Sequence, residues 1–180
     1  LYEEVRALAE QPIGATAAEV LDGRREVCRV EECTMGNIVA DSMRFNSGAQ
    51  IAIMNGGGVR ASIDVGDITL GELLTVQPFS NLLATFELTG ANVIVALENG
   101  VSGILATDGV ISREGLGGRF PQVSGLRFSY DPTLEVGSRV STVEVENSDG
   151  TFSPIEPDVV YTVVTNGFMR TGGDGYSVLN

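Results

Sequence analysis

Two apolar runs, each followed abruptly by a glycine-rich polar segment, constrain how this chain can fold. Residues 51–54 precede Asn-Gly-Gly-Gly-Val-Arg at 55–60, and residues 161–164 precede the segment 166–176. A short, continuous apolar run is typical of a buried strand, and glycine lets the backbone turn sharply or approach a ligand closely. Because both segments also carry polar or aromatic side chains, the pattern predicts a ligand-binding rim where two buried strands end.

Length and charge narrow the classes of protein that this chain can belong to. Its 180 residues, 43% of them apolar, fit one domain with a core of its own. The net charge of −13 and the pI near 4.2 disfavour binding to nucleic acid or to an anionic membrane surface, since both would repel the protein. No apolar run approaches the roughly 18 residues of a membrane span.

The basic residues are unusual because all 11 are arginine, with neither lysine nor histidine present. Without histidine the chain lacks the commonest metal ligand and the commonest general base, so we expect no metal site and no catalytic residue in it. Arginine suits bidentate recognition of phosphate or carboxylate, although a compositional bias would explain the set equally well.

Hydrophobic periodicity predicts alternating helices and strands in the first half and mostly strands in the second. Residues 102–118 read as a surface loop without a recognisable function. The last three strands are separated by turn-forming segments and are expected to pair antiparallel. The predicted helices are 1–10, 38–45 (capped by Thr34 or Asn37), 67–76 (capped by Asp67 or Thr69) and 93–99 (capped by Thr89 or Asn92). The predicted strands are 13–21 (ending in a hairpin-like turn at 22–23), 50–54, 82–88, 122–130, 139–146 and 159–165.

Several nucleotide and hydrolase motifs are absent. A Walker A loop needs lysine, and the three glycines at 56–58 do not have the spacing of a dinucleotide-binding fingerprint. A Gly-x-Ser-x-Gly elbow and a histidine-dependent triad are also missing, which excludes the usual nucleophilic hydrolases. The pattern therefore favours a binding site.

The candidate binding residues together have the chemistry of a nucleotide site. Guanidinium groups neutralise phosphate, aromatic rings stack on a base, and a carboxylate accepts hydrogen bonds from ribose hydroxyls. The alternatives are a solvated Arg/Glu cluster and phenylalanines that anchor loops to the core. The candidates are Arg25, Arg29 and Arg60 for an anion, Phe79 and Phe168 for stacking, Asn55 and Asn81 as amides, and Asp174 as an acceptor.

Cys28 and Cys33 are the two cysteines of the chain. Their spacing is compatible with a short-loop disulfide or with two free thiols, and a four-ligand zinc site would have to recruit carboxylates.

The order and spacing of four motifs resemble the C-terminal domain of the 5′-nucleotidase family. These motifs are C-R-x-x-E-C-x-M-G-N at 28–37, N-G-G-G-V-R-A-S-I at 55–63, G-D-I-T followed by Q-P-F-S-N within 66–81, and N-x-F-x-x-x-G-G-D-G-Y at 166–176. The resemblance implies an α+β fold with a mixed sheet and flanking helices. It implies that residues 13–180 form a substrate-binding domain and that residues 1–12 are the remnant of an inter-domain linker helix.

The same resemblance implies a division of labour with a second domain. A separate N-terminal metallophosphoesterase domain would carry two divalent metal ions and the catalytic residues, so we expect this chain alone to be inactive. The implied reaction is hydrolysis of nucleoside 5′-monophosphates, and the implied location is extracellular, periplasmic or at the cell surface. A stand-alone nucleotide-binding module, or a domain of a cyclic-nucleotide, UDP-sugar or NAD hydrolase of the family, is the alternative.

Individual residues acquire roles from the resemblance. The three arginines match phosphate-contacting residues, the two phenylalanines match the pair that sandwiches the base, and Asp174 matches the ribose-binding carboxylate. Asn55 matches an amide of the animal branch and Asn81 one of the bacterial branch, so this sequence combines features of both. The cysteine pair resembles a disulfide of the animal enzymes. Six glycines are expected to shape the two loops, namely Gly56, Gly57, Gly58, Gly172, Gly173 and Gly175.

Overall fold

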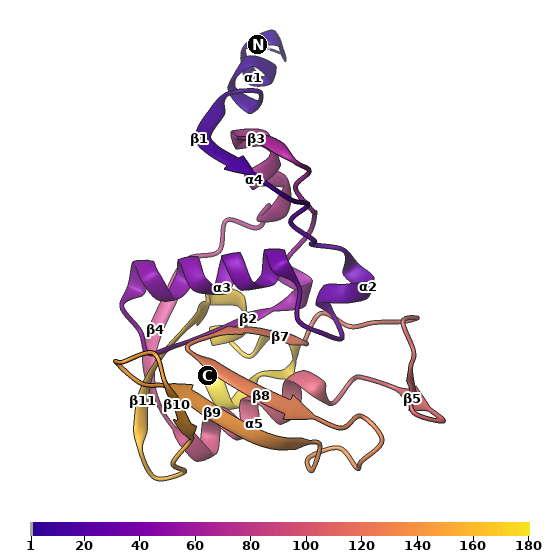
Figure 1. The fold of residues 1–180 in the computed structure, drawn as a ribbon, viewed down its shortest axis with the longest axis vertical. Coiled ribbons are helices and arrows are strands. Elements are labelled where there is room, and N and C mark those ends of the chain that lie inside the picture. Colours follow the sequence, from indigo (N-terminus) through magenta and orange to yellow (C-terminus); the bar gives the residue numbers. More distant parts are fainter. Residues whose placement is uncertain (1) are drawn as a thin grey trace.

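A four-stranded mixed sheet lies at the centre of the molecule, in a computed structural model that describes residues 2–180 (Figure 1). Its strand order is β4 (Leu83–Thr89), β11 (Val160–Asn166), β2 (Ile51–Asn55) and β7 (Pro121–Ser124). β11 runs parallel to β2, whereas the outer pairs β11–β4 and β2–β7 are antiparallel. The two apolar runs that predicted buried strands are therefore the two central strands.

Helices and a second sheet cover this central sheet on its two faces (Figure 1). On one face lies α3 (Thr34–Ser47), and on the other lie α5 (Gly90–Val101) and a three-stranded antiparallel sheet. That second sheet has the order β10 (Phe152–Pro154), β9 (Val140–Glu146) and β8 (Leu126–Tyr130). The chain thus has the mixed-sheet, helix-flanked architecture that was expected.

Alternation along β2 explains why both faces need a cover. Ile51 and Ile53 pack with α5 and the second sheet, while Ala52 and Met54 pack with α3. Successive side chains of a strand point to opposite faces, so a strand that is apolar at every position must be buried on both sides. All five residues of β2 are buried.

An arm at the N-terminal end projects from this body (Figure 1). It contains α1 (Tyr2–Ala9), β1 (Pro12–Ala17), β3 (Gly66–Thr69) and α4 (Leu70–Val76), and β1 pairs antiparallel with β3. Thr69 and Glu72 form a capping box that starts α4, which confirms one of the two predicted caps.

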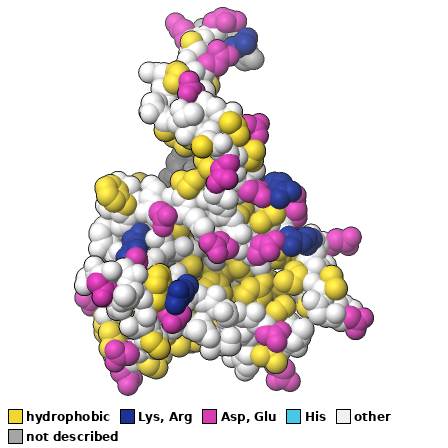
Figure 2. Space-filling view, viewed as in Figure 1, with side chains coloured by type: hydrophobic (Ala, Val, Ile, Leu, Met, Phe, Trp, Pro, Cys, Tyr) yellow, Lys and Arg dark blue, Asp and Glu magenta, His cyan; other side chains and the backbone are white. Residues whose placement is uncertain are grey.

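The remaining elements are short. They are α2 (Arg25–Cys28), the 3₁₀ turns η1 (Gly56–Gly58), η2 (Gly173–Gly175) and η3 (Ser177–Leu179), the hairpin of β5 (Ala106–Thr107) and β6 (Val110–Ile111), and α6 (Gly167–Arg170). Among residues 2–180, no helix is both long and apolar enough to cross a bilayer. Acidic side chains are spread over the arm and the body on the face that Figure 2 shows, in line with the net charge of −13.

Three expectations about local structure were wrong. The segment 122–130 is not one strand, because the chain turns at Gly125 (φ 75°) and passes from the central sheet to the second sheet. The strand at 13–21 ends at Ala17 and makes no hairpin at 22–23, because its partner is β3. Helix α3 is capped by neither Thr34 nor Asn37 but by Cys33, whose Sγ accepts from the N–H of Gly36.

The pairing of the last three predicted strands was also only partly right. β8 and β9 pair antiparallel, but β11 lies in the other sheet, between β4 and β2.

Candidate functional site

The two glycine-rich loops meet because the central strands are parallel. β2 ends at Asn55 and β11 ends at Asn166, at the same edge of the sheet. The Nδ2 of Asn166 donates a hydrogen bond to Oδ1 of Asn55 at 2.9 Å. The loops that follow are therefore adjacent although about a hundred residues separate them in the sequence.

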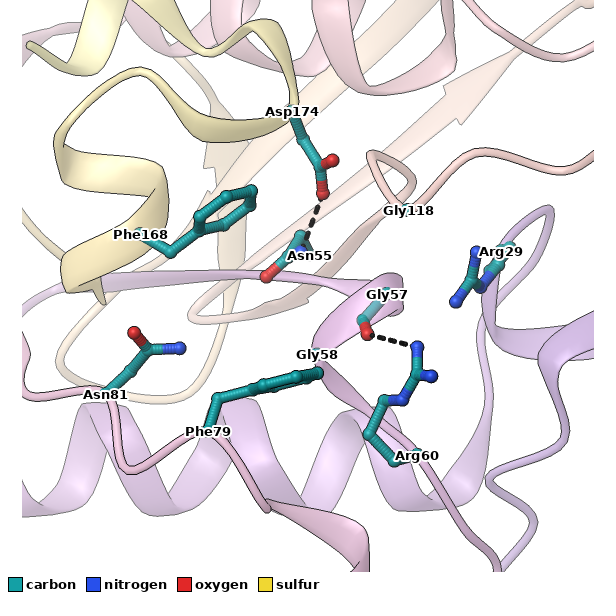
Figure 3. Close-up of a pocket in the computed structure, with 10 residues that line it drawn as sticks. All are labelled: Arg29, Asn55, Gly57, Gly58, Arg60, Phe79, Asn81, Gly118, Phe168 and Asp174. Atoms are coloured by element: carbon teal, nitrogen blue, oxygen red, sulfur yellow. Dashed lines mark hydrogen bonds between the residues drawn. The ribbon is translucent and has the colours of Figure 1, made fainter.

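An open cavity of about 550 Å³ lies beside these strand ends (Figure 3). Its volume is within the range of small-molecule sites. All of the predicted binding residues line it except Arg25, and Gly118, which was not predicted, lines it as well. The lining consists of Arg29, Asn55, Gly57, Gly58, Arg60, Phe79, Asn81, Gly118, Phe168 and Asp174.

Two phenylalanine rings face this cavity rather than the core. Phe79 lies in the loop after α4 and is 54% exposed, and Phe168 lies in α6 and is 45% exposed. Figure 3 shows both side chains extending into the same space from separate elements. The guanidinium carbon of Arg60 lies 5.5 Å from the centroid of the Phe79 ring, within the range of a cation–π contact. Half-exposed rings leave aromatic faces free for a planar ligand.

Three guanidinium groups gather at one end of the site. Arg25 Nη2 and Arg29 Nη1 donate to the same backbone carbonyl, that of Leu116, at 2.9 and 3.1 Å. Arg60 Nη1 donates to the carbonyl of Gly57 at 3.2 Å. Burial lowers the pKa of Arg29, the positive charges of Arg25 and Arg60 lower it further, and the negative charge of Asp174 opposes them.

The buried Nε of Arg29 has no hydrogen-bond partner within residues 2–180. Clustered guanidiniums with spare donors favour a bound anion.

The carboxylate of Asp174 also faces the site (Figure 3). Asn55 Nδ2 donates to its Oδ2 at 2.7 Å, and Asn99 Nδ2 donates to its backbone carbonyl at 3.3 Å. Asp174 has a left-handed backbone (φ 54°) between Gly172 (φ 86°) and Gly175 (φ 83°). This turn presents the carboxylate at the cavity.

Close approach explains two of the other predicted glycines. A Cβ on Gly56 would lie 1.9 Å from the carbonyl oxygen of Cys28, so η1 can pack against α2 only without a side chain. A Cβ on Gly173 would lie 2.6 Å from ring atoms of Phe168. Gly57 and Gly58 line the cavity directly.

The loop that carries Arg29 is fastened at both ends. Cys28 and Cys33 form a disulfide with an S–S distance of 2.02 Å, as the resemblance implied. The buried side chain of Gln122, in β7, hydrogen-bonds the backbone of residues 28, 31 and 33. Sequence reasoning missed Gln122, and its one signal was a polar residue at the start of an apolar strand candidate.

Metal ligands do not gather anywhere in the described chain. Within residues 2–180 no three Cys, Asp or Glu side chains form a group that could hold a metal ion.

Comparison with known proteins places this geometry in a family. The profile described as "5'-nucleotidase, C-terminal domain" matches residues 12–180. The chain is 43% identical over 179 residues to the trifunctional nucleotide phosphoesterase protein YfkN of Bacillus subtilis (strain 168), covering 97% of this chain and 12% of that protein. It is 34% identical over 187 residues to a snake venom 5'-nucleotidase of Macrovipera lebetinus, covering 94% of this chain and 43% of that protein.

Among solved structures, the 5'-nucleotidase precursor from Thermus thermophilus is similar, with a TM-score of 0.88 and 44% identity. That match covers 98% of this chain and 33% of the Thermus chain. These relatives are thus much longer than the described chain, which corresponds to a domain of each. On the profile match over nearly its whole length, this chain belongs to the 5′-nucleotidase C-terminal domain family.

Proposed function

We propose that this chain is the nucleotide-binding domain of a metal-dependent 5′-nucleotidase, which hydrolyses nucleoside 5′-monophosphates to nucleoside and phosphate. The observation that carries the proposal is that two half-exposed phenylalanine rings, an arginine cluster and a carboxylate surround one cavity. A nucleoside monophosphate has one group for each of them, namely a base, a phosphate and a ribose.

Each of these contacts has a physical role. Phe79 and Phe168 stack on the base, a contact worth about 1–3 kcal/mol per stacked base. Arg29 and Arg60 neutralise the phosphate, with Arg25 beside them, and Asp174 accepts hydrogen bonds from ribose hydroxyls. Asn55 and Asn81 contact the edge of the base. Holding the phosphoester in one orientation lowers the entropic part of the barrier to its hydrolysis.

The hydrolytic step itself belongs to another part of the polypeptide in this proposal. An N-terminal metallophosphoesterase domain would carry two divalent ions, and these would supply water activation and stabilisation of the transition state. The described chain supplies affinity and orientation and is inactive alone. The disulfide and the likeness to a venom enzyme support a location outside the cytoplasm, which is extracellular, periplasmic or at the cell surface.

Calorimetric titration tests the binding role. We expect AMP to bind more tightly than adenosine, because of the arginines, and more tightly than ribose 5-phosphate, because of the rings. Equal affinity for all three compounds would contradict the proposal.

An assay of AMP hydrolysis with added divalent metal tests the division of labour. The full-length protein should turn over AMP and the 180-residue chain should not. Turnover by the 180-residue chain would show that catalytic residues lie within it.

A wider substrate range is the second candidate. The Bacillus relative is described as a trifunctional nucleotide phosphoesterase, so cyclic nucleotides, UDP-sugars and NAD belong in the same assay. A binding-only module would hydrolyse none of them in its full-length form.

A further inference from the structure

We propose that Asn166 is a positioning residue that fixes the direction of the Asn55 amide and, through it, the placement of the Asp174 carboxylate. This inference rests on the proposed nucleotide-binding function, because its consequence is ribose recognition. None of the binding roles described above involves Asn166, which lies beneath the cavity and does not line it.

The direction of each hydrogen bond follows from one backbone group. The N–H of Met169 can only donate, and it donates to Oδ1 of Asn166 at 2.9 Å. The other polar atom of Asn166 is therefore Nδ2, which donates to Oδ1 of Asn55 at 2.9 Å. Asn55 must then present its own Nδ2 to Asp174, where it donates to Oδ2 at 2.7 Å. Each amide is thus oriented by the one before it.

Burial makes this hydrogen-bond relay, which runs from Met169 through Asn166 and Asn55 to Asp174, rigid. Asn166 and Asn55 are each 4% exposed, and the methionines that touch them, Met54 and Met169, are 2% and 0% exposed. Hydrogen bonds are stronger in such surroundings, and water cannot easily replace a lost partner. A reversed Asn55 amide would point its oxygen at a carboxylate, so only one direction is favourable.

The same residue also begins the helix that carries Phe168. Asn166 is the N-cap of α6, which spans only Gly167–Arg170 and includes Phe168. So short a helix depends on its cap and on packing, because helix nucleation is unfavourable. Asn166 therefore couples the stacking ring to the ribose-binding carboxylate.

Two substitutions separate the cap from the relay. Asn166→Ser and Asn166→Asp both keep an oxygen that can cap α6, since Asn, Asp and Ser are similarly good caps. Serine is too short to reach Asn55, so it leaves the Asn55 amide undirected. Aspartate turns a carboxylate toward Oδ1 of Asn55, which forces the amide to reverse and face Asp174 with its oxygen.

Affinity of the full-length protein for adenosine at pH 8 should therefore fall in a set order. We expect a loss of about 3- to 10-fold for Asn166→Ser and a larger loss for Asn166→Asp. If Asn166 acted only as a helix cap, both variants would bind adenosine with nearly wild-type affinity. Asn46→Asp is the matched control, because Asn46 is exposed on α3 and its side chain hydrogen-bonds Ser42 of the same helix.

Comparing nucleosides with and without ribose hydroxyls tests whether the loss of affinity arises at the ribose-binding carboxylate. Wild type should prefer adenosine to 2′,3′-dideoxyadenosine, and Asn166→Asp should bring the ratio of the two dissociation constants toward one. The control variant should keep the wild-type ratio. A ratio unchanged in both Asn166 variants would overturn the proposal.

Crystal structures of the two variants decide the matter without a ligand. The Asp174 carboxylate should leave Asn55 in Asn166→Asp, and an unmoved Asn55–Asp174 hydrogen bond in both variants would also overturn the inference. If wild type binds no nucleoside, the proposed function fails, and these structures still test the relay.

Discussion

The side chain of Gln122 accepts a hydrogen bond from the backbone N–H of Cys33 at 3.1 Å, although the two residues are 89 positions apart. Its Nε2 donates to the carbonyls of Cys28 at 3.0 Å and Glu31 at 2.8 Å. Gln122 is 1% exposed and lies in β7, next to β2. One buried amide thus fastens the loop that carries Arg29 to the central sheet.

Replacing this amide should weaken both the fold and the phosphate end of the site. Gln122→Leu leaves one N–H and two carbonyls without their partner, and a single buried unsatisfied group costs about 1–3 kcal/mol. We expect the free energy of unfolding in urea to fall by at least that amount. Where the variant is folded, calorimetry should show a larger loss of affinity for AMP than for adenosine, because Arg29 is displaced.

The matched control is Gln50→Leu. Gln50 is exposed and hydrogen-bonds Thr162 at the other end of the sheet. Equal losses of AMP and adenosine affinity in Gln122→Leu would argue against a role in holding Arg29.

Removing either aromatic ring should weaken nucleoside binding without unfolding the protein. Phe79 and Phe168 are about half exposed, so Phe79→Ala and Phe168→Ala remove little buried surface. Each should cost about 1–3 kcal/mol of adenosine binding, the energy of one stacked base. Calorimetry with ribose 5-phosphate should show a much smaller change.

Phe45→Ala provides the comparison for these two variants. Phe45 is 88% exposed on α3 and does not line the cavity. Unchanged adenosine affinity in Phe168→Ala would count against stacking.

Removing the disulfide should loosen the arginine loop more than the rest of the fold. The bridge closes a short loop, with a sequence separation of 5, so its entropic contribution is expected to be about 2 kcal/mol. The double variant Cys28→Ser, Cys33→Ser should therefore unfold at lower urea concentration. Its amide hydrogen exchange should rise around residues 28–33 before it rises in β2. Uniform protection across the chain would contradict this.

Stability should fall at alkaline pH because of Tyr130. Burial raises the pKa of Tyr130 to about 12, and the negative charge of Glu31 adds to the shift. The folded state therefore keeps the phenol proton at pH values where the unfolded chain, with a pKa near 10, has lost it. The stabilisation is complete below about pH 10 and is lost as the pH rises toward 12.

Urea unfolding at several pH values checks this window. The phenol donates to the carbonyl of Val30, so Tyr130→Phe should be less stable at pH 8 and show a shallower decline above pH 10. A decline of the same steepness in the variant would assign the effect to another group, such as Tyr176, whose pKa burial also raises.

Sequence reasoning found the parts of the fold that local patterns specify. The run before Asn55 is apolar at every position and the run before Asn166 is mainly apolar, and both form largely buried strands. Thr69 with Glu72 is a local capping signal. The segment 122–130 was misread because the chain turns at Gly125 (φ 75°), where a Cβ would lie 2.0 Å from the carbonyl oxygen of the distant Gln50, a contact that no local pattern reveals.

In the candidate site, too, residues in local motifs were predictable, whereas residues that act through long-range contacts were not. Its side chains follow short motifs and were therefore predictable as a group. Leu116, whose carbonyl accepts from two arginines, and Gln122 act through hydrogen bonds across about 90 residues of sequence. Nothing local marks such partners, since a backbone carbonyl has no sequence signature. Asn166 was within a predicted loop, but its role depends on the parallel pairing of β2 with β11.

That parallel pairing has an evolutionary consequence. Asn55 and Asn166 mark a boundary at the edge of the sheet: the residues before them fill the core, and the residues after them meet the cavity. Insertions or exchanges beyond this boundary alter the ligand surface while the core strands stay unchanged. With such a scaffold, substrate preference can diversify among descendants while the fold is retained.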